Sequence, residues 1–202
     1  MYEFFQKVLQ LWLTGGTLMI PLAALCLLIF ASAAQLWRYF ARREFRRLDE
    51  VTWQEWVKHP SRSRGEVGEI IRYTQDEVEN IGEIQGRFSE VITAKLPPVQ
   101  RQLMFLNVMV AAAPLMGLLG TVLGMIHTFE AIAAGGSELT GAMASGISEA
   151  LITTEVGLLI AIPGFFAANV IKRRQHEYEA FLGKLESCTV QHFRMSHVLP
   201  AP

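Results

Sequence analysis

The sequence predicts an all-α membrane protein in which three transmembrane helices extend into a cytoplasmic helical bundle. Two observations lead to this fold class. Of the 202 residues, 51% are hydrophobic and 18% are charged, whereas soluble domains carry roughly 25% charged residues. The charges are also segregated, because three long stretches contain almost none and the segments between them are rich in Arg and Glu. This segregation is typical of a chain whose apolar runs lie in lipid and whose loops lie in water.

The three apolar runs define the predicted spans. The first run, residues 17–37, contains no charged residue. At 1.5 Å per residue it extends over roughly 31 Å, enough to cross a hydrocarbon core of about 30 Å. The second and third runs are also long enough to cross once. We therefore predict transmembrane helices at residues 16–37, 103–129 and 141–171.

A secretory signal peptide is an alternative interpretation of the first run. Residues 31–33, Ala-Ser-Ala, resemble a cleavage site. The segment before the run is not basic, however, and five arginines follow it, at Arg38, Arg42, Arg43, Arg46 and Arg47. A basic cluster in that place resists export. The sequence therefore favours a retained transmembrane helix.

Lys and Arg also predict the direction of the three spans. They cluster after the first span and again at residues 172–174, and the loop at residues 130–140 contains none. By the positive-inside rule, the N-terminus and this loop lie outside, in the periplasm of a bacterium. Residues 38–102 and the C-terminal segment, residues 172–202, then lie in the cytoplasm.

The segments outside the spans are predicted to be helical. Residues 1–15 place Tyr, Phe, Leu and Trp at helical spacing and are expected to form an amphipathic helix on the outer membrane surface. Residues 38–58 are expected to continue the first span, and residues 66–95 to form one amphipathic helix that ends before Pro97 and Pro98. A charged helix is expected to follow the third span. Long cytoplasmic helices need neighbours to cover their apolar stripes, which indicates self-association.

Several function classes have no support in the sequence. The two cysteines, Cys26 and Cys188, are far apart and show no metal-ligand spacing. The sequence shows no nucleic-acid-binding motif, no phosphate-binding loop and no set of nucleophile and base. We therefore expect no enzyme activity, no metal site and no nucleic-acid partner.

Small residues form a stripe on each of the last two predicted spans. Gly117, Thr121 and Gly124 share one face of the second, at positions i, i+4 and i+7. The third carries a longer stripe, formed by Gly146, Ala150, Thr154, Gly157 and Ala161. Small stripes allow helix backbones to approach closely in lipid. The threonine hydroxyls either bond to carbonyls of their own helix or line a water-accessible path, and the spacing leaves both interpretations open.

Two carboxylates lie inside the third predicted span. A charged carboxylate in mid-membrane costs about 2.5–3.5 kcal/mol on insertion scales, so such residues usually face a cavity or a partner. Glu149 and Glu155 are six positions apart, roughly 240° around a helix, so we expect one to face a pore and the other a helix interface. His127, near the outer end of the second span, either partners Glu149 or is exposed at the membrane interface.

Two long motifs resemble a known family. Residues 113–129 read APLMGLLGTVLGMIHTF, and residues 146–170 read GISEALITTEVGLLIAIPGFFAANV. They resemble the second-helix and third-helix signatures of the MotA/TolQ/ExbB proton-channel family, in the same order and with the same predicted topology. The short cytoplasmic domain and the three spans are closer to its ExbB/TolQ branch than to MotA.

The resemblance implies a function and a set of partners. Family members form pentamers in the bacterial inner membrane around a dimer of a single-span protein, ExbD or TolR, whose intramembrane Asp takes up and releases protons. The motion is passed to TonB or TolA. The resemblance therefore implies a homopentamer that uses protons as its coupling ion and no cofactor. The alternatives are a TolQ-like subunit for envelope integrity and cell division, and a membrane scaffold that conducts nothing.

The resemblance also assigns roles to residues. Thr121 and Thr154 match the pore threonines, and Glu149 matches the glutamate of the family's Glu-Ala-Leu element. Glu155 stands where a small or apolar residue is expected, and we include it in the expected proton pathway. The remaining matches are helix-bending prolines and close-packing glycines: Pro114 and Pro163, and Gly117, Gly120, Gly124, Gly146 and Gly157.

Overall fold

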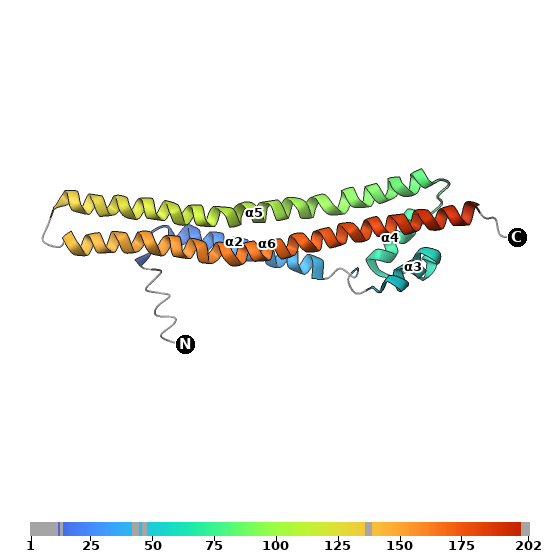
Figure 1. Cartoon of the computed structure of the whole chain (residues 1–202), viewed down its shortest axis with the longest axis horizontal. Coiled ribbons are helices and arrows are strands. Elements are labelled where there is room, and N and C mark those ends of the chain that lie inside the picture. The colour runs from blue at the N-terminus through green and yellow to red at the C-terminus, as the bar shows by residue number, and fades with distance from the viewer. Residues whose placement is uncertain (1–11, 13, 42–44, 46–47, 136–138, 199–202) are drawn as a thin grey trace. The chain divides into compact units, whose positions relative to one another are not determined.

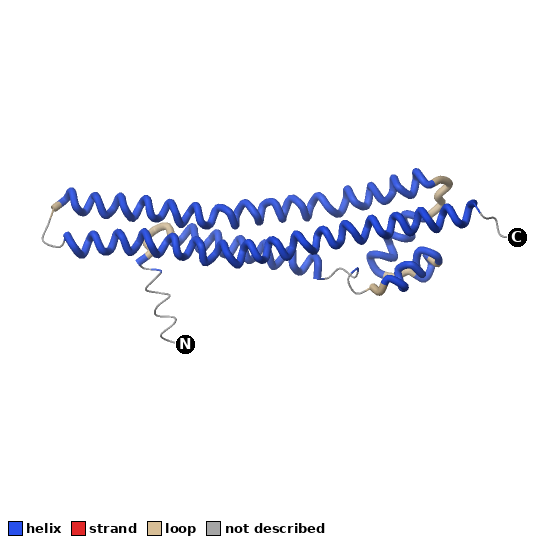
Figure 2. Tube along the Cα trace, viewed as in Figure 1, coloured by secondary structure: helices blue, strands red, loops and turns tan. Residues whose placement is uncertain are grey.

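The computed structural model describes residues 12, 14–41, 45, 48–135 and 139–198, and within them the protein contains helices and no strands (Figures 1 and 2). Most of the predicted outer-surface helix at residues 1–15 lies outside the described residues. The elements, in chain order, are α2 (Met19–Ala41), α3 (Glu50–Lys58), the short 3-10 helix η2 (Pro60–Arg62), α4 (Gly65–Gln75), α5 (Ile81–Ala134) and α6 (Leu139–Val198).

Three helices are long and apolar enough to cross a membrane. They are α2, α5 and most of α6. The second and third predicted spans lie within α5 and α6, and α2 covers the first predicted span from residue 19 onward. The helices α5 and α6 are longer than a bilayer requires, with 54 and 60 residues, so each has a polar part outside its apolar part. The all-helical architecture with three candidate spans is therefore confirmed, and the direction of crossing stays a prediction.

The first span does not continue to residue 58 as the sequence pattern predicted. The helix α2 ends at Ala41, and α3 begins as a separate helix at Glu50. Asp49 explains this start, because its carboxylate accepts a hydrogen bond from the Glu50 backbone N–H at 2.9 Å. A side chain that accepts from the first free amides of a helix is a strong start signal.

The predicted single helix at residues 66–95 is two helices. The helix α4 ends at Gln75, and Glu77 adopts a left-handed backbone with φ 44°. The side chain of Asn80 then accepts from the Glu83 N–H at 2.9 Å, and Glu83 accepts from the Glu79 N–H at 3.1 Å. This arrangement resembles a capping box whose return bond goes to the residue before the N-cap, and it begins α5.

The pair Pro97 and Pro98 does not end a helix, because α5 runs through both residues. A proline inside a helix removes a backbone hydrogen bond and usually breaks the helix. Here the flanking residues Leu96 and Val99 are buried, so packing on both sides offsets the local penalty. At the far end of α5, Gly135 has φ +62°, the conformation in which glycine commonly terminates a helix.

The chain divides into two compact units. The first consists of residues Met1–Ala34 and Met104–Asn169, and its core is apolar, with Leu22, Ile29 and Leu106 fully buried. Large apolar side chains cover its outside, among them Leu27, Leu115, Leu118, Leu151, Leu159, Ile162 and Phe166. A surface of this kind is unfavourable in water, and it suits contact with lipid or with other membrane chains.

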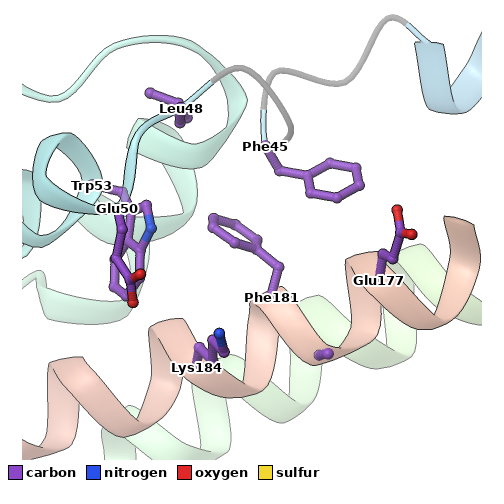
Figure 3. A pocket seen from close by; sticks show the side chains of 8 residues that line it. Phe45, Leu48, Glu50, Trp53, Glu177, Phe181 and Lys184 are labelled. Carbon is purple, nitrogen blue, oxygen red and sulfur yellow. The ribbon is translucent and has the colours of Figure 1, made fainter.

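The second unit consists of residues Gln35–Leu103 and Val170–Pro202. In it, Phe45 packs on Tyr178 and Phe181 with ring centroids 5.1 and 5.7 Å apart, and Trp53 packs edge-on against Phe181 at 5.9 Å. The rings of Phe45, Trp53 and Phe181 border an open groove of about 370 Å³ (Figure 3). The guanidinium of Arg174 lies 3.5 Å from the centre of another ring, that of Trp37, where a cation–π contact joins α2 to α6.

Candidate functional site

The candidate site is the seam along which α5 and α6 pack against each other in the first unit. The seam runs antiparallel, because Gly117 packs near Thr154, Gly120 near Thr153, and Gly124 near Gly146. On α5 it consists of Ala113, Gly117, Gly120, Gly124 and Thr128, and on α6 of Gly146, Ala150, Thr153 and Gly157, all of them buried. Both sets advance by three or four residues at a time, about one helical turn, so each set lies along one face of its helix.

The glycines of the seam leave no room for side chains. A Cβ on Gly157 would lie 2.7 Å from the Ala113 carbonyl oxygen, and one on Gly117 would lie 3.0 Å from the Thr153 carbonyl oxygen. A Cβ on Gly124 would lie 2.7 Å from the Gly146 carbonyl oxygen. The two distances of 2.7 Å are shorter than real Cβ contacts, and the third is tighter than most of them, so the two backbones are in close contact. The arrangement is the one expected of small-residue stripes in membrane helices.

Sequence reasoning missed three residues of the seam, Ala113 and the two threonines Thr128 and Thr153. Thr153 is 1% exposed and its Oγ1 donates to the Ala150 carbonyl at 3.0 Å. Thr128 is also buried and donates to the Gly124 carbonyl at 2.8 Å. The repeat i, i+3, i+7 would have found Thr153, because it replaces Thr121 by Gly120 and Thr154 by Thr153 in the stripes. Thr128 extends the stripe of α5 by one further turn, four residues after Gly124.

The two threonines expected in a pore lie on one flank of the seam. Thr121 follows Gly120 and Thr154 follows Thr153, so each is rotated by about 100° from a buried residue of the seam. In an antiparallel pair of helices this places both on the same side. Thr121 donates to the carbonyl of its own helix at Leu118, 2.7 Å away. Thr154 donates across the seam to the Gly117 carbonyl at 3.0 Å, an arrangement that neither earlier interpretation contained.

The carboxylate of Glu149 lies on the opposite flank. Its Oε2 is 3.5 Å from Nδ1 of His127, and the two side chains are 22% and 54% exposed. The carboxylate also contacts the backbone of Gly16, just before α2, because a Cβ on Gly16 would lie 2.5 Å from its carboxyl carbon. His127 therefore combines both predicted roles, since it is exposed and also lies beside Glu149.

Glu155 does not join either group. It is exposed on α6, and at about 100° per residue it points away from the seam. Its neighbours one turn away, Leu151, Leu158 and Leu159, are also exposed. The structure therefore brings Glu149 together with His127, and it separates both from Glu155. The expected helix-bending residues Pro114 and Pro163 lie inside α5 and α6, which continue through them.

The chemistry available at the seam is that of polar side chains in an apolar setting. The threonines offer hydroxyl oxygens that accept hydrogen bonds, and Glu149 and His127 can bind and release protons. Among the described residues, no group of three or more His, Cys, Asp or Glu side chains has the arrangement of a metal site.

Comparison with known proteins gives the family. A profile of the MotA/TolQ/ExbB proton channel family matches residues 64–182. The biopolymer transport protein ExbB of Xanthomonas campestris is 38% identical over 84 residues, which are 42% of this chain and 33% of that protein. The Tol-Pal system protein TolQ of Haemophilus influenzae is 33% identical over 100 residues, 48% of this chain and 44% of that protein.

A longer match exists in an archaeon. A protein described as an ExbB homologue in Methanothermobacter thermautotrophicus is 29% identical over 177 residues, 79% of this chain and 61% of that protein. The chain thus spans a third to about three fifths of the length of these relatives. The family profile covers more than half of the chain and includes both motifs of the α5–α6 seam, so the resemblance read from the sequence is confirmed. The chain is a multi-pass membrane protein that belongs to the MotA/TolQ/ExbB proton channel family.

Proposed function

We propose that the chain is a subunit of a pentameric inner-membrane motor of the ExbB–ExbD type, in which the proton-motive force energises TonB-dependent transport. The threonine flank of the α5–α6 seam is the observation that carries this proposal. It presents two polar side chains, Thr121 and Thr154, along a surface that is otherwise apolar.

The hydrogen bonds of the flank fit a path for protons carried by a partner. Both threonines use their hydroxyl proton on a backbone carbonyl. The hydroxyl oxygen of each threonine can then still accept a hydrogen bond from a group that lies against the flank. A surface of acceptors suits a protonated carboxyl group or water, because both donate hydrogen bonds. The intramembrane Asp of an ExbD-like or TolR-like protein, once protonated, is a donor of this kind.

The outer surface of the first unit supports assembly into an oligomer. Its spans keep most large apolar side chains exposed, and Glu155 lies among them on α6. A mid-membrane carboxylate is unfavourable against lipid. Covering Glu155 with a neighbouring copy removes it from lipid, which favours an oligomer over a monomer. The inner dimer of the single-span partner then lies against the threonine flank.

The first test is native mass spectrometry of the chain, alone and co-expressed with a single-span partner of the ExbD or TolR type. We expect five copies that take up two copies of the partner. Proteoliposomes containing the complex should then conduct protons when a membrane potential is applied. A monomer or dimer that ignores the partner and conducts nothing would contradict the motor and favour a membrane scaffold.

A TolQ-like role is the second candidate, and the match to the Haemophilus influenzae TolQ over 100 residues favours it. In this case TolR and TolA replace ExbD and TonB, and the motor serves envelope integrity and cell division. Complementation separates the two roles. Rescue of TonB-dependent uptake in a strain lacking ExbB and TolQ supports the first role, whereas rescue of detergent resistance and septation supports the second.

A further inference from the structure

His127, Glu149 and Gly16 form a small polar cluster on the flank opposite the threonines. They come from three separate segments: α5, α6 and the residues just before α2. The imidazole Nδ1 lies 3.5 Å from Glu149 Oε2. The histidine is the more exposed member, with 54% of its side chain accessible against 22% for the glutamate. His127 is therefore the outer, more exposed member of the cluster, and Glu149 is the inner member, which lies against the backbone of Gly16.

Gly16 fixes the position of the inner member. A Cβ at this residue would coincide with Glu149 Oε1 and would lie 3.1 Å from Glu149 Cγ. Gly16 also has φ +67°, a conformation that side chains rarely adopt. The absence of a side chain thus allows the carboxylate to rest against the backbone and keeps its second oxygen turned toward His127.

Few other ionisable groups lie near this cluster in the described part of the first unit. On α5, Glu130 follows His127 by one turn and is exposed. On α6, Glu155 is more than one turn away and points to another side. From the segment before α2, the backbone of Gly16 lies against the carboxylate. His127 and Glu149 therefore form the pair, and Glu130 serves as a matched control on the same helix.

We propose that His127 is a proton relay between the water at the α5–α6 turn and the carboxylate of Glu149, with Gly16 holding that carboxylate in place. This inference rests on the proposed function, because it supplies the proton-conducting complex with an entry step. The turn between α5 and α6 contains no Lys or Arg in the sequence, and the positive-inside rule places it on the outer side, from which protons enter.

The relay is a balanced proton transfer. A hydronium ion donates a proton to the Nε2 nitrogen of a neutral imidazole and becomes water, and the N–H of Nδ1 breaks as its proton moves to Glu149 Oε2. The imidazole is neutral again as the other tautomer, and the carboxylate has become a carboxylic acid. A heavy-atom separation of 3.5 Å requires a small approach or one bridging water. Histidine suits this task because one ring nitrogen can accept a proton while the other donates one.

The experiment uses the full chain, co-purified with its single-span partner, in proteoliposomes with a proton-sensitive dye. We expect His127→Ala to lower proton flux about tenfold, less than the roughly 100-fold effect of an acid–base group in catalysis, because water still reaches Glu149. Adding imidazole outside the vesicles should restore most of this flux. His127→Gln, which keeps a polar side chain, should lose flux to a similar extent, and Glu130→Gln should conduct as the wild type does.

The outcomes separate this inference from the proposed function. A wild-type complex that conducts no protons refutes the proposed function and the relay with it. A conducting wild type whose His127→Ala and His127→Gln variants assemble and conduct at the wild-type rate from pH 5 to 8 overturns the relay alone. Lost flux that imidazole does not restore also overturns it, because His127 would then act through structure. Glu149→Gln should lose flux with no rescue, which checks that the added imidazole does not carry protons by itself.

Discussion

The hydroxyl of Thr154 on α6 donates a hydrogen bond to the carbonyl oxygen of Gly117 on α5, 3.0 Å away across the helix seam. The contact is possible because Gly117 has no side chain, and a Cβ there would lie 3.0 Å from Thr154 Cα. One residue therefore does two things. It joins two membrane helices, and it places a hydroxyl oxygen on the flank that we propose lines the proton path.

Replacing Thr154 by valine should separate these two roles. Valine keeps the shape and removes the hydroxyl, and interhelical hydrogen bonds in membranes contribute about 0.6 kcal/mol on average. We expect a loss of stability of that order in detergent unfolding, together with a clear loss of proton flux. Thr154→Ser should keep most of both. If the valine variant conducts at the wild-type rate, Thr154 is a packing residue and does not line the path.

Adding a single methyl group at Gly120 should break the seam. In Gly120→Ala, the new Cβ would collide with the side chain of Thr153, and overpacking of this kind costs about 1–3 kcal/mol. We expect loss of the assembled complex in native mass spectrometry. The double variant Gly120→Ala with Thr153→Gly places the glycine of this contact on α6 instead of α5, and it should recover assembly.

Gly86 provides the control for this prediction, because it lies on the same helix and a Cβ there would meet nothing within 4 Å. Gly86→Ala should be neutral or stabilising by up to about 1 kcal/mol, the difference in helix propensity. Equal effects of alanine at Gly86 and Gly120 would mean that helix propensity, and not close packing, determines the result.

The start of α5 depends on Asn80. Its side chain accepts from the Glu83 N–H at 2.9 Å and donates to Glu83 Oε1 at 2.9 Å. Asn80→Ala should cost about 1 kcal/mol, the usual value for a lost cap. Hydrogen exchange should become faster over the first turn of α5, and Asn80→Asp should restore protection. Unchanged exchange in the alanine variant would show that packing alone fixes this helix start.

The sequence predicts the spans and the glycines of the seam, since both depend on properties that the residues carry themselves. Long apolar runs and glycine spacing are direct evidence of lipid contact and close packing. The predicted helix ends were less accurate, because each end depends on the balance between local side-chain caps and packing. Pro97 and Pro98 remain in the helix because the flanking side chains of Leu96 and Val99 are buried by packing.

The candidate site was predicted in part. Thr121, Thr154 and Glu149 were identified from motifs, but the sequence does not tell which flank of the seam each occupies. That depends on the antiparallel register of α5 against α6. Likewise, the contact of Glu149 with Gly16 joins residues more than a hundred positions apart, and no local pattern indicates it.

Tyr73 should make the stability of the second unit depend on pH in the alkaline range. Its hydroxyl donates to Glu90, and this bond raises the pKa of the tyrosine above its usual value. A raised pKa in the folded protein means that the stabilisation is complete below about pH 10, the usual tyrosine pKa. It is lost as the pH rises through the higher folded pKa. Tyr73→Phe should therefore be less stable than the wild type at pH 8, and this difference should disappear at strongly alkaline pH. A difference independent of pH would exclude the hydrogen bond as its cause.

Glu155 should mark a contact between copies of the chain. It is exposed among the apolar side chains of α6, and a carboxylate facing lipid there would be unfavourable by about 2.5–3.5 kcal/mol on insertion scales. If a neighbouring copy covers it, Glu155→Leu removes a polar contact, and we expect the oligomer to dissociate at lower detergent concentration. Glu155→Gln keeps a hydrogen-bonding side chain and should dissociate as the wild type does. An oligomer of the leucine variant that resists detergent better than the wild type would instead place Glu155 against lipid, because leucine is the more favourable residue in that position.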